Sequence, residues 1–383
     1  MKTIYFDNGA TTKVDEKVVE AMKKCFTEEY GNASSLHHKG QEAKRALELA
    51  RDVIAKSIGA KSEEIVFTSG GTESNNFAIK GVAFANKDKG NHIITTKVEH
   101  DCVLNACRWL ETQGFQVTYM DVDSEGFVRS EDLENAITDK TILVSIIHGN
   151  NEIGTINDLK VLGGICRKHK VYFHTDACQS HTKTELNVKK QPVDLVTFNA
   201  HKIHGPKGVG ALYVRKGTRI TSLAHGGGQE NGMRSGTENV PGTVGFAKAT
   251  KLALKASNVK YMTKLRDKLI KGLLEIPDTK LNGPMGDKRL CHNINVAFKY
   301  IEGEALGSYL DAKGICTSTG SACSSKSLEP SHVLLGIGLQ PQDAHGSLRL
   351  GISRFTTEDE VDFVLNEIRK TVQKLRKMSP FGK

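Results

Sequence analysis

Short apolar runs rich in β-branched residues alternate with helical stripes over the first two thirds of the chain. Between several of the runs, apolar residues recur every three or four positions. The seven runs lie at 64–68, 92–98, 116–122, 141–148, 171–176, 194–198 and 208–214. Buried strands that alternate with helices form a largely parallel sheet covered by helices. The pattern therefore predicts an α/β fold with seven strands in one large sheet.

The pattern changes after about residue 255. Two helical stretches and two strand-like runs follow, at 259–274, 358–375, 293–298 and 347–352. This α+β pattern predicts a second, smaller domain. We expect residues 15–255 to form the large domain, and residues 1–14 together with 256–383 to form the small one.

Composition narrows the class of protein. The 383 residues are 38% hydrophobic and 25% charged, which is typical of a globular chain. No apolar run approaches the length of about 18 residues that spans a membrane, and the N-terminus lacks the apolar core of a secretory signal. We therefore expect a cytoplasmic protein with no membrane contact. The net charge of +9 comes from basic residues interleaved with acidic ones, so direct nucleic-acid binding is not expected.

The eight cysteines include no CxxC pair, which argues against zinc-ribbon and thioredoxin-like sites, and no metal site is expected. Most should be buried thiols. Cys323 differs, because the residues from 317 to 325 are nearly all small and polar. Such a stretch cannot form a core and predicts an exposed, mobile loop with an accessible thiol. Cys316, seven residues away, is the alternative reactive cysteine.

Ligands of open α/β sheets bind at the carboxyl ends of the strands. The run 64–68 is followed by Gly70, Gly71 and Thr72 at the start of a predicted helix, which can form a cradle for an anion. An ordinary glycine turn with a helix cap remains the alternative. The run 171–176 ends in Asp176, which is a helix cap in the simplest interpretation.

Lys202 follows the predicted strand 194–198 and precedes a glycine-rich turn. Burial lowers the pKa of a lysine and makes its amine a nucleophile able to form a Schiff base. The alternative is a lysine that extends to the surface. One cofactor accounts for this lysine, for Asp176, for a ring-stacking histidine and for a phosphate cradle together. That cofactor is pyridoxal phosphate (PLP).

The chain resembles the cysteine desulfurases of the NifS/IscS type, which are fold-type I PLP enzymes. The resemblance runs nearly from end to end and rests on eight segments in the same order. They are TSGGTESNN (68–76), EH (99–100), NNEIG (150–154), HTDACQS (174–180), AHKIHGPKGVGALYVR (200–215), GGGQENGMRSGTENV (226–240), STGSACSS (318–325) and SLEPSHVL (327–334).

The resemblance implies a role for each matching residue. Lys202 would form the imine with the cofactor, and Asp176 would pair with the pyridine nitrogen. His100 would stack on the ring and assist proton transfer, while Asn151 and Gln179 would bind on the side of the phenolic oxygen. The residues implied at the phosphate are Gly71, Thr72, Asn199, His201 and, from the second subunit of a homodimer, Thr237.

The implied reaction converts L-cysteine to L-alanine and leaves the sulfur as a persulfide on Cys323. Arg349, helped by Asn32, would bind the substrate carboxylate. The loop length resembles the branch of the family that passes sulfur to partners, so an iron–sulfur scaffold or a sulfur-carrier protein is the expected acceptor, for cluster assembly or tRNA thiolation. Alternatives are a selenocysteine lyase, another PLP-dependent lyase or aminotransferase of this fold, and a non-catalytic sulfur-carrier or assembly scaffold.

Three positions depart from the family pattern. Asn199 stands where a phosphate-binding serine is usual, Ala33 replaces a common proline, and Cys178 replaces a common threonine. Asparagine also offers a neutral hydrogen-bond donor, so we expect position 199 still to serve the phosphate.

Overall fold

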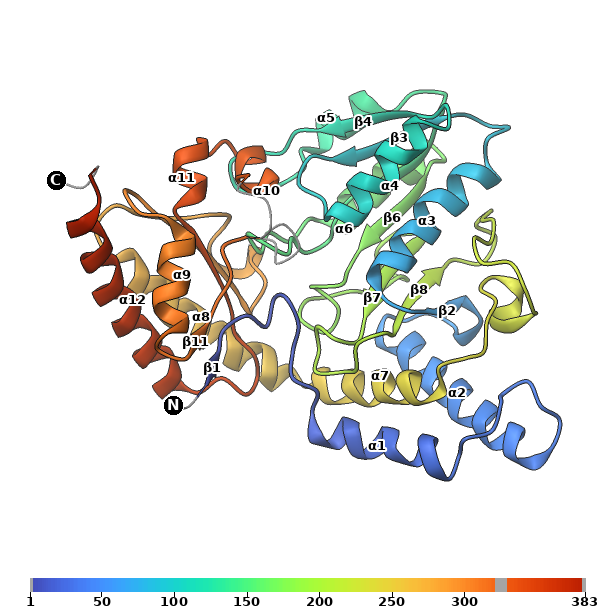
Figure 1. Cartoon of the computed structure of the whole chain (residues 1–383). Coiled ribbons are helices and arrows are strands. Elements are labelled where there is room, and N and C mark those ends of the chain that lie inside the picture. The colour runs from blue at the N-terminus through green and yellow to red at the C-terminus, as the bar shows by residue number, and fades with distance from the viewer. Residues whose placement is uncertain (1–2, 321–328, 381–383) are drawn as a thin grey trace.

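A seven-stranded sheet forms the centre of the larger part of the molecule (Figure 1). The computed structural model describes residues 3–320 and 329–380. The strand order is β2-β8-β7-β6-β5-β3-β4, and β8 alone runs in the direction opposite to the other six strands of this sheet. The strands are β2 (Ile65–Thr68), β3 (His92–Thr96), β4 (Gln116–Met120), β5 (Thr141–Ser145), β6 (Tyr172–Asp176), β7 (Leu195–Asn199) and β8 (Gly210–Val214).

All seven predicted strands are confirmed, but several ends differ. β3 and β5 stop two and three residues before their predicted ends, because Val98 and His148 already belong to the loops that enter the site. β7 starts and ends one residue later than predicted, and Asn199 pairs with Gly210 of β8. The carboxyl end of β7 therefore brings Asn199 to the sheet edge.

Successive side chains of each central strand point to opposite faces, and both faces are apolar. In β5, for example, Val144 belongs to the core on one face and Leu143 to the core on the other. Helices cover both faces, as a mostly parallel sheet requires. One face packs against α2 (His38–Ser57), α5 (Ser130–Ala136), α6 (Leu159–Lys168) and α7 (Val240–Ala253), and α1 (Glu16–Thr27) lies beside α7. The other face packs against α3 (Gly71–Ala85) and α4 (Asp101–Glu111).

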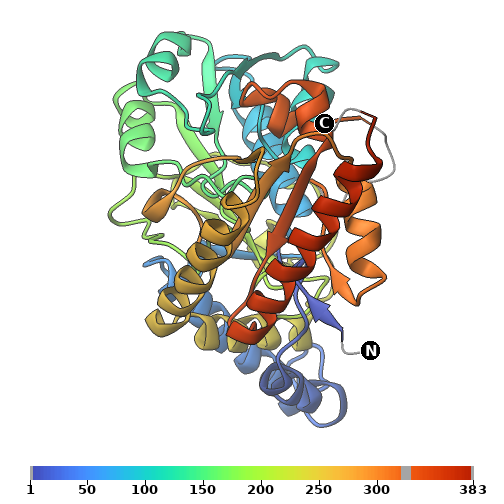
Figure 2. The same ribbon diagram turned by 90° about the vertical axis from the view of Figure 1, so that its left-hand side faces the viewer.

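A smaller α+β layer lies beside this sheet (Figure 2). Its antiparallel sheet has the order β12-β10-β9, and β10 has the predicted bounds. Its strands are β9 (Thr279–Leu281), β10 (Asn293–Phe298) and β12 (Ser347–Gly351), and β1 (Ile4–Tyr5) pairs with β11 (Ile315–Cys316). The helices are α8 (Ala256–Leu274), α9 (Gly303–Asp311), α10 (His332–Gly336), α11 (Pro341–His345) and α12 (Glu358–Met378).

The core of this layer joins the two ends of the chain. Ile4 and Phe6 pack in one apolar cluster with Leu265, Phe298 and Val364. The chain thus returns to its own start, as the predicted domain division requires, although the bounds of that division stay a prediction. Short 3₁₀ helices occupy Ser62–Glu64, Gln229–Gly232 and Gly286–Lys288. Within 3–320 and 329–380, no helix is long and apolar enough to cross a membrane.

Candidate active site

A cavity of about 260 Å³ lies where the carboxyl ends of β2, β3, β5, β6 and β7 meet. Residues from the N-terminal segment and from β12 complete its wall. Most of the residues predicted from the sequence line it. They are Gly71, Thr72, His100, Asn151, Asp176, Gln179, Asn199, His201, Lys202 and Arg349.

Lys202 follows β7 and points into this cavity rather than to the surface. Its Nζ donates hydrogen bonds to the carbonyl oxygens of Gly9, at 2.5 Å, and of Ala10, at 2.7 Å. These two carbonyls hold the amine at the end of the strand. The position suits an amine that attaches a cofactor aldehyde.

Asp176 is the last residue of β6, and both of its carboxylate oxygens accept hydrogen bonds. Oδ2 accepts one from Asn75 Nδ2 at 2.6 Å, and Oδ1 accepts one from the backbone N–H of Cys178 at 2.8 Å. Burial, together with the neighbouring Asp176, raises the pKa of the Cys178 thiol well above its usual value, so this thiol stays protonated. The arrangement fixes the carboxylate as a partner for a protonated ring nitrogen.

His100 caps the N-terminus of α4. Its Nδ1 accepts a hydrogen bond from the backbone N–H of Cys102 at 3.1 Å and lies 3.1 Å from the sulfur of the same residue. In the neutral ring the proton is then on Nε2. The cap therefore fixes both the ring orientation and the tautomer of a histidine that lines the cavity.

The N-terminus of α3 supplies an anion cradle. Gly71 is the first residue of this helix, where backbone N–H groups have no partner within the helix. A Cβ atom at position 71 would lie 2.7 Å from Cys178 Sγ and 3.3 Å from Asn199 Nδ2, so the close approach requires glycine. The glycine lets the backbone lie directly against the cavity.

Two further groups at this end are suited to hold a phosphate. Asn199 Nδ2 lies 3.3 Å from where a Cβ atom of residue 71 would stand and can donate a hydrogen bond, whereas the Asn199 amide oxygen can only accept and is buried with no partner among the described residues. Burial, with Lys202, Lys207 and Lys183 nearby, lowers the pKa of His201 to about 3, so its ring is a neutral donor or acceptor. A side-chain amide donor beside a helix N-terminus, with a lysine and an aspartate in the same cavity, fits PLP.

Arg349 of β12 closes the cavity on the other side. One guanidinium nitrogen contacts Asp7 at 3.3 Å and another the carbonyl of Asn151 at 3.3 Å, while Nε is buried with no partner among the described residues. Burial raises the pKa of Asp7 and outweighs the opposite effect of Arg349. A buried guanidinium with a spare donor is suited to bind a substrate carboxylate.

Two of the predicted residues that the structure describes are not brought to this cavity. Asn32 is exposed between α1 and α2, where its Oδ1 accepts a hydrogen bond from the backbone N–H of Ser34, and Thr237 is exposed in the segment before α7. Neither lines the cavity. Cys323 lies outside the described residues. The roles of Asn32, Thr237 and Cys323 stay predictions.

The structure also adds residues that the sequence reasoning missed. Asn75 binds Asp176, Cys102 contacts His100, and the carbonyls of Gly9 and Ala10 hold Lys202. The signal for Asn75 was its place in the glycine-rich segment 68–76. The signal for Gly9 and Ala10 was weaker, namely a run of small and polar residues after the apolar N-terminal strand.

Known proteins are similar to this chain both in sequence and in fold. The family model described as aminotransferase class-V matches residues 4–364. Cysteine desulfurase IscS of Methanosarcina thermophila is 54% identical over 382 residues, covering 99% of this chain and 94% of that relative. A cysteine desulfurase of Nostoc sp. is 48% identical over 384 residues, covering 100% of this chain and 96% of that relative.

Solved structures agree with these relatives. A structure titled "NIFS-LIKE PROTEIN" has a TM-score of 0.92 and 41% identity, covering 98% of this chain and 100% of its own. A structure titled "SspA in complex with cysteine" has a TM-score of 0.83 and 37% identity, covering 93% of this chain and 100% of its own. The chain therefore belongs to the class-V aminotransferase family and, within it, to the cysteine desulfurases. The predicted family and fold class are confirmed.

Proposed function

We propose that this protein is a PLP-dependent cysteine desulfurase that converts L-cysteine to L-alanine. The observation that carries the proposal is the single cavity that joins Lys202, Asp176 and His100 with the N-terminus of α3 and the buried Arg349. No other common cofactor uses a lysine amine, a carboxylate and an anion cradle in this combination. The relative solved with cysteine supports the choice of substrate.

Each residue has a task that its position allows. PLP, when bound, withdraws electrons from the α-carbon of an attached amino acid. Asp176 would keep the ring nitrogen protonated, and the cradle at Gly71, Thr72, Asn199 and His201 would hold the phosphate. Arg349 binds the substrate carboxylate through a spare donor.

Proton transfer falls to two groups that line the cavity. The amine of Lys202 would accept the α-proton of the substrate. His100 lines the same cavity and, with its proton on Nε2, would assist as a hydrogen-bond donor at the substrate. Both groups are fixed by backbone contacts, which limits the reorganisation that each transfer needs.

The sulfur step is assigned to Cys323. Its thiolate attacks the substrate sulfur, a sulfur–sulfur bond forms and the carbon–sulfur bond breaks. The electron pair of the broken bond stays with carbon, which takes up a proton. One cysteine and one protein thiol thus give one alanine and one protein persulfide, with no external oxidant or reductant.

The proposed assembly is a homodimer, in which Thr237 of each protomer reaches the phosphate of the partner. Its exposed position away from the cavity of its own chain supports this arrangement. An iron–sulfur scaffold or a sulfur-carrier protein is the proposed acceptor of the persulfide sulfur, and the cytoplasm is the proposed location.

Reconstitution tests the function directly. Purified protein loaded with PLP is incubated with L-cysteine, alanine is quantified, and Cys323 is examined by mass spectrometry for a persulfide. Lys202→Ala should abolish alanine formation, whereas Lys189→Met, an exposed lysine, should not. Alanine at the parent rate from Lys202→Ala would refute the assignment of the lysine. Turnover of selenocysteine but not of cysteine would favour the selenocysteine lyase.

A further inference from the structure

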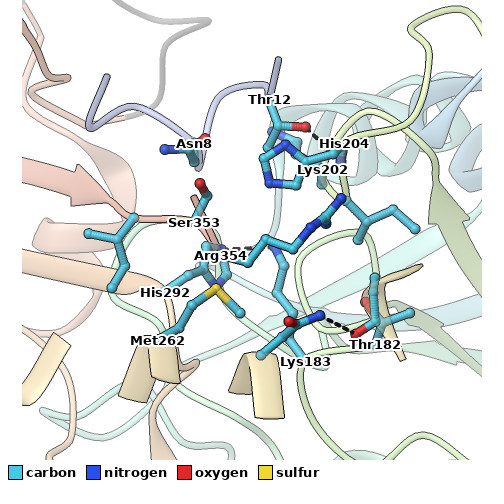
Figure 3. Close-up of a pocket in the computed structure, with 14 residues that line it drawn as sticks. Asn8, Thr12, Thr182, Lys183, Lys202, His204, Met262, His292, Ser353 and Arg354 are labelled. Atoms are coloured by element: carbon cyan, nitrogen blue, oxygen red, sulfur yellow. Dashed lines mark hydrogen bonds between the residues drawn. The ribbon is translucent and has the colours of Figure 1, made fainter. Parts of the chain in front are cut away.

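A second, smaller cavity of about 30 Å³ lies behind Lys202 (Figure 3). Lys183 and His292 line it, and both are buried, with 8% and 2% of their surface exposed. The volume is large enough for a water molecule but not for a substrate. Neither residue touches the main cavity, so the proposed reaction leaves their presence unexplained.

These two residues belong to a chain of polar contacts that ends at the main cavity. Lys183 Nζ lies 3.1 Å from His292 Nε2, and the same Nε2 lies 3.0 Å from Gln179 Oε1. Gln179 Nε2 donates to the carbonyl of Gly9 at 2.8 Å, and that carbonyl also accepts from Lys202. Gln179 is the member of the chain that lines the main cavity.

The direction of each hydrogen bond follows from the carbonyl of Gly9. A carbonyl can only accept, so the NH₂ end of the Gln179 amide faces Gly9 and the amide oxygen faces His292. His292 must then carry its proton on Nε2 in order to donate. Burial, first of all, lowers the pKa of His292 well below its usual value, so the ring holds a single proton.

The other tautomer of His292 is unfavourable for a second reason. Its Nδ1 is buried with no hydrogen-bond partner among the described residues. A proton on Nδ1 would be a buried donor without an acceptor, which costs more than an unpaired acceptor lone pair. The resting arrangement therefore has Nε2–H donating to Gln179, which leaves a second amide N–H of Gln179 to face the main cavity.

Lys183 fits this arrangement only when it is neutral. A neutral amine has a lone pair that can face the Nε2–H of His292, whereas an ammonium has only donors. The pKa of Lys183 is lowered to about 7, chiefly by burial and also by Lys202, while Cys291 and Cys178 act in the opposite sense. The other ionisable groups that line this cavity are His204 and Arg354, and its described lining includes no carboxylate.

Protonation of Lys183 would reverse the direction of its hydrogen bond with His292. The ammonium donates to Nε2, the ring proton must then move to Nδ1, and Gln179 loses its donor. We propose that Lys183 and His292 are positioning residues that hold the Gln179 amide in its donor orientation, and that protonation of Lys183 releases it. The proposal rests on the proposed function, in which Gln179 faces the phenolic oxygen of PLP.

The affinity of the apo-protein for PLP, measured by absorbance titration from pH 6 to pH 8.5, tests the role of Lys183. Loss of one hydrogen bond should weaken binding by about three- to tenfold, and this loss should appear below about pH 7. Lys183→Met keeps the shape but cannot be protonated, so it should lack this part of the pH dependence. Lys189→Met, at an exposed lysine nearby, is the control and should follow the parent. Identical pH curves for Lys183→Met and the parent would overturn the proposal.

Two variants of His292 test the direction of the contacts. His292→Gln offers an N–H close to the original Nε2 and should retain most of the affinity at pH 8. His292→Phe keeps a ring without a donor and should bind at pH 8 about as weakly as the parent does at pH 6. Equal affinity of the two variants at pH 8 would contradict the proposed hydrogen bond.

A measurement without the cofactor separates this inference from the proposed function. Nitrogen-15 NMR of histidine-labelled apo-protein, with His292→Gln used for assignment, should show the proton of His292 on Nε2 at pH 8. A proton on Nδ1 at pH 8 would refute the proposed hydrogen bond from His292 to Gln179, even if the enzyme is active. Failure of the parent to bind PLP at any pH would instead refute the proposed function, and the tautomer would still test the contacts.

Discussion

Gly71→Ala tests the close approach that forms the phosphate cradle. The added methyl group would lie 2.7 Å from Cys178 Sγ, well inside normal contact, and 3.3 Å from Asn199 Nδ2. The next nearest atom, in Thr197, is 4.0 Å away. Nearly all of the clash is therefore with one sulfur atom, which lines the cavity next to Asp176.

The expected cost has two parts. Overpacking a closely packed position by one methyl group costs about 1–3 kcal/mol of the free energy of unfolding. If the helix start moves to relieve the clash, a hydrogen bond from a backbone N–H to the phosphate is lost as well. Such a bond to a charged group contributes about 1.5–3 kcal/mol, so PLP affinity should fall by about tenfold or more.

Cys178→Ala provides the matched rescue, because it removes the clashing sulfur. We expect the double variant Gly71→Ala with Cys178→Ala to recover at least about 1 kcal/mol relative to the sum of the single variants. Gly164→Ala, in α6 with no atom within 4 Å of its added methyl group, is the control and should not destabilise the protein.

Urea unfolding of the apo-proteins measures the loss of stability, and absorbance titration with PLP measures the loss of cofactor affinity. The reasoning fails if Gly71→Ala matches the parent in both assays. It also fails if removal of the Cys178 sulfur recovers neither quantity, because the contact that limits position 71 would then lie elsewhere.

Variants at three other positions and one assembly measurement test the rest of the site. Asn199→Ser should change PLP affinity by less than about tenfold, whereas Asn199→Asp should weaken it far more by setting a carboxylate against the phosphate, and cofactor titration distinguishes them. Cys323→Ser should still bind PLP but form no persulfide by mass spectrometry, and a persulfide on Cys316 instead would move the role there. Arg349→Lys should raise KM for cysteine by about tenfold or more, since lysine cannot form the planar fork, and an unchanged KM would remove Arg349 from substrate binding. Light scattering should show a homodimer, and an active, PLP-saturated monomer would exclude the contact from Thr237.

The local pattern of the sequence was sufficient for the seven strands of the large sheet, for β10, β12 and α12, and for the order of the site segments. β10 has its predicted bounds, and α12 begins at Glu358 as predicted. Alternation within a strand and a capping box at Thr357 act over a few residues, so they are visible without the fold. Because the carboxyl ends of parallel strands meet at one edge, the sequence also indicated that Asp176 and Lys202 lie near each other.

Contacts between distant segments depended on the tertiary structure. Arg349 meets Asp7 from the opposite end of the chain, and Lys183 meets His292 across 109 positions. No local pattern records these contacts, because they depend on how two packed layers place their loops against each other. The same holds for the burial that lowers the pKa of Lys183, since desolvation depends on every segment around the amine. The sequence thus determined which chemical groups stand at the strand ends, and the packing of the chain decided which of them touch and in which protonation state.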